Sequence, residues 1–149
     1  MDRVRHELEA RKRMVMAMGL TAVWVGIAIM VMGAPNFLEE WFSPWSRYVL
    51  GGTTFTAGLF TCIGGAYGDD TRCGWWSQVL GLSGMIAWQV FMAAAYTGRV
   101  LDQGVFLAVP GEPLNAATTG RGYVPFLYVG LALGTLIPLL TMLRNGRPR

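Results

Sequence analysis

Charged residues are scarce in this chain, and the few that are present avoid its long apolar stretches. Asp, Glu, Lys and Arg make up 14% of the 149 residues, whereas about 25% is usual for a soluble domain. Four apolar stretches, each about the 20 residues that a helix needs to cross a bilayer core, contain no charged residue: 14–34, 48–67, 75–96 and 123–143. We therefore predict a single-domain, all-α integral membrane protein with four transmembrane helices.

The absence of ionisable groups from these stretches limits the chemistry that is available at membrane depth. Proton relays, ion-coupled transporters and voltage sensors place Asp, Glu, His, Lys or Arg inside the membrane, and this chain places none there. The only histidine, His6, precedes the first stretch, so a bis-histidine haem is excluded. No catalytic set of nucleophile, base and acid gathers on one face. We expect a protein that is not an enzyme and that holds no cofactor or metal.

Cysteine is also rare, since Cys62 and Cys73 are the two in the chain. Eleven helical residues would separate them by about 16 Å, and a disulfide requires Cα atoms within about 7 Å. We predict two free thiols and no metal-binding cysteine spacing.

Basic residues gather at the two ends of the chain. Arg11, Lys12 and Arg13 precede the first stretch, and three arginines follow the last. Because cytoplasmic flanks of membrane helices are enriched in Lys and Arg, we predict that both termini are cytoplasmic. Anionic lipid headgroups suit such ends better than nucleic acid does. The arginine-rich, lysine-poor usage favours the inner membrane of a bacterium, or a phage protein made there.

Aromatic residues mark the predicted membrane boundaries. The first outer loop, between Pro35 and Pro44, carries apolar and aromatic residues on one helical face, which predicts a short interfacial helix. Tryptophan side chains favour the headgroup level, so we predict four interfacial anchors: Trp41, Trp45, Trp75 and Trp76.

Small residues recur within the spans at helical spacing, which favours close helix packing. Glycines repeat every seven residues in the first span, and Gly130 and Gly134 form a GxxxG pair in the fourth. The second span has two adjacent rows of small or hydroxyl residues, so we expect it to be the least exposed to lipid. The predicted packing positions are Gly19, Gly26, Gly33, Ala57, Gly58, Thr61, Gly65, Gly81, Gly84, Gly130 and Gly134.

Polar side chains in the spans are uncharged. Gln78 and Gln89 lie eleven residues apart, close to three helical turns, and so share a face of the third span. Together with Thr54 they are candidates for hydrogen bonds between helices; a contact with a substrate is the alternative.

These features favour an accessory subunit that packs against other transmembrane subunits, or against copies of itself, in a larger membrane complex. A second interpretation follows from composition. This chain is small and multi-pass, is rich in Gly and Ala within its spans and has a basic end, and in these respects it resembles phage holins, which self-assemble and permeabilise membranes. A third is a narrow channel or solute facilitator that is lined by the threonines of the second span.

Overall fold

The computed structural model describes residues 2–33, 43, 45–68, 71–102 and 124–145, and its regular structure there is helical. The four helices are α1 (Asp2–Met32), α3 (Ser46–Tyr67), α4 (Arg72–Asp102) and α6 (Val124–Asn145). Each is long and apolar enough to span a membrane, over residues 9–32, 46–67, 72–98 and 124–145. The all-helical fold with four candidate membrane spans is therefore confirmed.

Two helices extend well beyond the predicted apolar stretches: α1 begins at Asp2 instead of residue 14, and α4 ends at Asp102 instead of residue 96. At its other end α1 stops before Gly33, which has a φ of 96° and donates its N–H to the carbonyl of Ile29 over 3.0 Å. A positive φ after the last helical turn is typical of a glycine that ends a helix. The predicted interfacial helix between Pro35 and Pro44, including Trp41, lies outside the described residues.

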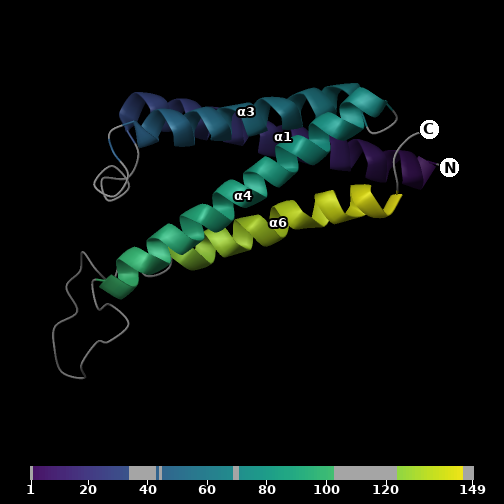
Figure 1. The fold of residues 1–149 in the computed structure, drawn as a ribbon. Helices are drawn as coiled ribbons and strands as arrows, with labels where there is room; N and C mark the ends of the chain where they lie inside the picture. Colours follow the sequence, from purple (N-terminus) through teal and green to yellow (C-terminus); the bar gives the residue numbers. More distant parts are fainter. Residues whose placement is uncertain (1, 34–42, 44, 69–70, 103–123, 146–149) are drawn as a thin grey trace, which may run out of the picture.

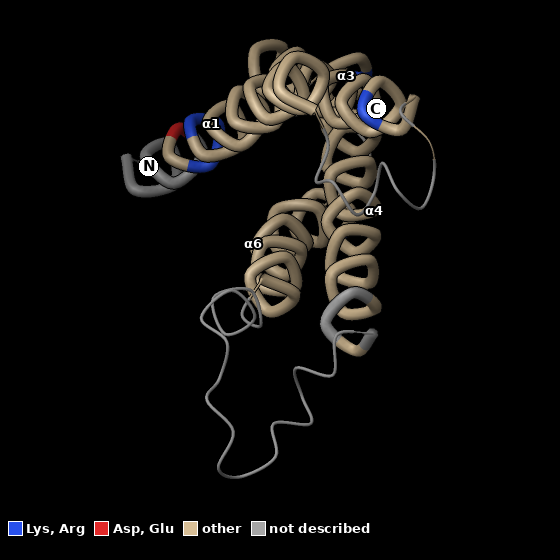
Figure 2. Tube along the Cα trace, turned by 90° about the vertical axis from the view of Figure 1, so that its left-hand side faces the viewer, with Lys and Arg blue, Asp and Glu red and all other residues tan. Residues whose placement is uncertain are grey.

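Consecutive helices pack against each other in turn: α1 on α3, α3 on α4, and α4 on α6. In Figure 1, α4 runs obliquely from the α1–α3 pair to α6. Figure 2 shows that α1 and α6 lie on the same side of α4 without running alongside each other. The start of α1 and the end of α6 lie at the same end of the molecule. The helices therefore form an open series instead of a closed four-helix ring.

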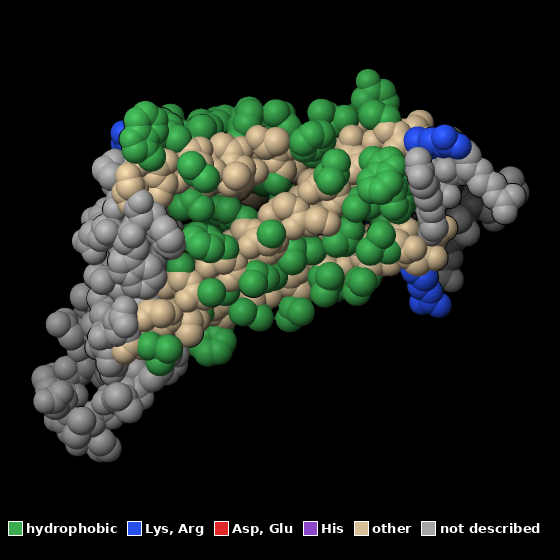
Figure 3. Space-filling model, in the orientation of Figure 1, with side chains coloured by type: hydrophobic (Ala, Val, Ile, Leu, Met, Phe, Trp, Pro, Cys, Tyr) green, Lys and Arg blue, Asp and Glu red, His purple; other side chains and the backbone are tan. Residues whose placement is uncertain are grey.

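Burial within the chain separates the middle helices from the outer ones. In the most apolar window of each helix, 39% of residues are buried in both α3 and α4, against 22% in α1 and α6. The central position expected for the second span is therefore shared with the third. Large apolar side chains such as Trp24 and Ile137 remain exposed, and Figure 3 shows hydrophobic side chains over the visible face with basic ones at the ends.

Candidate functional site

Glycines from α1 and α3 face each other in pairs. A Cβ on Gly58 would lie 2.7 Å from the carbonyl oxygen of Gly19, and a Cβ on Gly26 would lie 2.7 Å from that of Gly51. Both distances are too short for a real Cβ, so the two backbones approach more closely than any side chain allows. We call these four residues, Gly19, Gly26, Gly51 and Gly58, the glycine seam.

Gly51 was not among the predicted packing positions. The sequence does carry a signal for it, since Gly51 and Gly58 are seven residues apart, as are Gly19 and Gly26. Two antiparallel helices with the same glycine spacing can bring both pairs into register. Sequence reasoning also missed Gly64, whose position against the backbone of α4 leaves no room for a Cβ.

The opposite side of α3 packs on α4. Gly81 lies against the backbone of Thr61, and a Cβ on Gly84 would lie 3.1 Å from the Cβ of Ala57. The Gln78 amide donates from Nε2 to the carbonyl oxygen of Gly64 over 2.8 Å. Gln78 is 2% exposed, so this hydrogen bond ties α4 to α3 inside the apolar interior.

The buried threonine hydroxyls of α3 bond mainly to their own helix. Thr54 donates to the carbonyl of Leu50 over 2.7 Å, and Thr61 to that of Ala57 over 2.8 Å. Thr61 also lies 3.6 Å from the sulfur of Met85. Such back-bonding satisfies a hydroxyl in an apolar environment without water. Gly65, further along α3, lies against the side chain of Met16 from α1.

Large side chains, rather than glycines, join α4 to α6. The buried residues of this contact, which we call the side-chain seam, are Trp75, Leu82, Leu139 and Met142. Leu82 is fully buried, and the helix-interior proline Pro138 of α6 is also buried. One polar contact accompanies the seam: the hydroxyl of Thr135 lies 3.2 Å from Oε1 of Gln89.

The GxxxG pair lies on a face of α6 that no described helix covers. Apart from the backbone of α6 itself, a Cβ on either Gly130 or Gly134 would meet no atom of the described residues within 4 Å. Both glycines line a groove of about 590 Å³, which we call the α1–α6 groove. The glycines of α1 meet α3 closely, whereas those of α6 meet open space.

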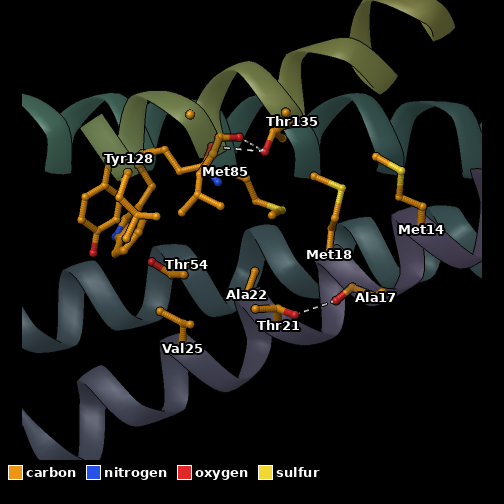
Figure 4. Close-up of a pocket in the computed structure, with 16 residues that line it drawn as sticks. Met14, Ala17, Met18, Thr21, Ala22, Val25, Thr54, Met85, Tyr128 and Thr135 are labelled. Atoms are coloured by element: carbon orange, nitrogen blue, oxygen red, sulfur yellow. Dashed lines mark hydrogen bonds between the residues drawn. The ribbon is translucent and has the colours of Figure 1, made fainter. Parts of the chain in front are cut away.

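Side chains from all four helices line the α1–α6 groove (Figure 4). Met14, Met18 and Val25 reach into it from α1, and Tyr128 and Thr135 come from α6. Among the described lining residues, Tyr128 alone has an ionisable side chain. The groove is thus an apolar space with a few neutral polar groups.

Two hydrogen-bond donors of α4 at this groove have no partner within the described part of the chain. The indole nitrogen of Trp88 is buried and makes no hydrogen bond. Gln89 is only 7% exposed. Its amide oxygen lies 3.2 Å from the hydroxyl of Thr135, which also donates to the carbonyl of Leu131 over 2.8 Å, and no bond to a described residue is found for its amide nitrogen. In hydrocarbon an unsatisfied donor is costly because water cannot replace the missing partner.

The predicted tryptophan anchors have different surroundings. Trp45, just before α3, is 73% exposed, and Trp76 is 44% exposed. Trp75 is 8% exposed and packs in the side-chain seam, and its role as an interfacial anchor stays a prediction. It contacts Trp76 edge-to-face at 4.9 Å between ring centroids. Proximity of α6 explains the burial, and the sequence of α4 does not contain that information.

Within the described residues, no three His, Cys, Asp or Glu side chains gather at one place. Cys62 and Cys73 are free thiols. The chain matches no protein-family model, and neither a curated protein nor a solved structure matches it.

Proposed function

We propose that this chain is a non-catalytic subunit of a larger membrane assembly, and that a transmembrane helix of another subunit covers the open side beside α6. The observation that supports this proposal is the uncovered Gly130–Gly134 pair. GxxxG pairs allow two helix backbones to approach closely. Within the chain such glycines are already matched on α1 and α3, which leaves the pair on α6 for a partner.

The shape of the fold supports the same proposal. α1 and α6 each pack extensively on one neighbouring helix only, and both have the lower buried share of the four. Helix association in membranes depends on close van der Waals contact. An outer helix with a smooth glycine strip is therefore suited to receive a further helix.

The experiment is purification of the tagged full chain from its native membrane in mild detergent. We expect another membrane protein at fixed stoichiometry with the wild type and at least tenfold less of it with Gly130→Leu/Gly134→Leu. Gly52→Leu is the matched control because a Cβ at Gly52 also meets nothing within 4 Å, while Gly52 does not line the groove. It should keep the partner.

Recovery of a lone monomer from native membranes would contradict the proposal. Recovery of a homo-oligomer, together with abrupt loss of membrane integrity on overproduction, would instead favour the holin-like alternative. A threonine-lined channel would be favoured if Thr54→Val/Thr61→Val altered solute flux into liposomes.

A further inference from the structure

We propose that the α1–α6 groove binds a neutral, lipid-soluble molecule with a carbonyl oxygen, of the prenylated quinone or ketone class, whose oxygen accepts a hydrogen bond from the Gln89 amide. This binding site goes beyond the subunit function proposed above and does not depend on it. Four observations support it: the dimensions of the groove, its unpartnered donors, their depth, and the side chains around them.

The dimensions of the groove are those of a small-molecule site. Along α1 the groove extends from Met14 to Val25, which at the helical rise is about 16 Å. Its volume of about 590 Å³ lies within the range of about 300–1,000 Å³ that is usual for small-molecule pockets.

The unpartnered donors indicate which group of the ligand enters. The Trp88 indole can donate but cannot accept a hydrogen bond, and its nitrogen is buried without a partner in the described residues. The neighbouring Gln89 amide lines the groove while 93% of its residue surface is buried. An acceptor such as a carbonyl oxygen satisfies the Gln89 amide, and a pure hydrocarbon does not.

The depth of Gln89 and Thr135 in the membrane favours a lipid-soluble carbonyl compound over a phospholipid as the ligand. Gln89 lies four residues from the middle of its membrane-spanning segment, 72–98, which is about 6 Å of helix. The partner side chain Thr135 is at the middle of segment 124–145. Phospholipid ester carbonyls lie at the edge of the hydrocarbon core, about 15 Å from its centre. A ligand without a charged headgroup can place its oxygen at the depth of Gln89.

The surrounding side chains suit a flat ring with an apolar tail. Trp88 and Tyr128 make an edge-to-face pair with centroids 5.6 Å apart, and Tyr128 stacks on Tyr96. Three methionines, Met14, Met18 and Met85, line the remaining length and can adapt to an irregular tail. The lack of a charged lining residue favours a neutral ligand.

The test is a titration of the purified full chain in lipid nanodiscs with a prenylated 1,4-naphthoquinone, followed by quenching of tryptophan fluorescence. We expect saturable quenching with the wild type. Gln89→Leu should weaken binding about tenfold, the loss that corresponds to one buried hydrogen bond. Trp88→Phe keeps a ring and removes the donor, so it provides a second variant if Gln89→Leu fails to fold.

Further variants test separately whether binding needs the Gln89 amide and whether it needs the open space of the groove. Thr135→Val breaks the Gln89–Thr135 contact but keeps the amide, so binding should stay within about twofold of the wild type. Gly134→Leu should abolish saturable quenching by filling the groove, whereas Gly52→Leu should not. Squalene, an isoprenoid hydrocarbon without a carbonyl group, should not compete with the quinone.

Linear, non-saturable quenching that is equal in the wild type and all variants would show partition into lipid only and overturn the proposal. A second result would also overturn it: mass spectrometry of an organic extract of the purified wild type finds phospholipid, but no more quinone or ketone than in an extract of Gln89→Leu. Co-purification of the partner with Gln89→Leu distinguishes the two proposals, since that variant should lose the ligand and keep the partner.

Discussion

The glycine seam and the side-chain seam solve the same packing problem in opposite ways. Between α1 and α3, facing glycines remove side chains so that backbones meet, with a hypothetical Cβ on Gly58 only 2.7 Å from the Gly19 carbonyl. Between α4 and α6, residues such as Leu82 and Met142 fill the space. The chain is thus sensitive to added atoms at one seam and to removed atoms at the other.

This difference also explains where the open space lies. Leu139 and Met142 of α6 pack on α4, whereas Gly130 and Gly134 line the groove. α1 has its glycines towards α3. The two outer helices therefore leave different surfaces available to lipid, ligand or partner.

Leu82→Ala should have the largest effect on stability, because it empties space in the side-chain seam. Deleting a fully buried leucine side chain typically lowers the free energy of unfolding by about 2–5 kcal/mol. Thermal unfolding in detergent micelles would measure it as a fall in the midpoint. Leu133→Ala, at a position 58% exposed on α6, is the control and should change the midpoint little. Equal effects of the two variants would rule out the side-chain seam as described.

Gly58→Ala should also destabilise the protein, but by adding atoms instead of removing them, since a single added methyl group meets backbone atoms of α1. The nitrogen of Val23 would lie 2.6 Å from the new Cβ, and overpacking of this kind typically costs about 1–3 kcal/mol. The same thermal measurement applies. Gly52→Ala, where the new Cβ meets nothing within 4 Å, should be neutral or slightly stabilising because alanine favours helix. A Gly58→Ala protein as stable as Gly52→Ala would contradict the close approach of α1 and α3.

Gln78→Leu should have the smallest effect of the three. It removes the 2.8 Å hydrogen bond to the Gly64 carbonyl at a seam that is otherwise held by small residues, and such bonds between membrane helices contribute about 0.6–2 kcal/mol. Denaturation by increasing SDS in mixed micelles would resolve a change of this size. An unchanged unfolding curve would mean that the amide contributes nothing net to the α3–α4 contact.

Much of the fold could be predicted from the sequence because the signals are local. Long uncharged stretches predict four helices, and Gly19 and Gly26 at heptad spacing predict a smooth stripe on α1. Gly51 and Gly64 were missed because a glycine's partner depends on the register of another helix. The burial of Trp75 could not be predicted either, because it packs with Leu139 and Met142, more than sixty positions away in the chain.

The candidate site was harder to predict than the helices. Gln89 and Thr135 were both visible as polar residues within apolar spans, but their contact joins different helices. Gly130 and Gly134 were recognisable as a packing motif, whereas the sequence could not show that no described helix fills the space beside them.

By itself, the sequence determined the apolar, uncharged character of the four helices, because hydrophobicity and helical spacing are properties of each segment alone. The tertiary structure decided which glycines meet backbone and which face open space. It also left the buried indole nitrogen of Trp88 without a partner among the described residues, next to the Gln89 amide that lines the groove. Those outcomes depend on the register and crossing of helices far apart in the chain, and shape complementarity between two surfaces cannot be read from either one.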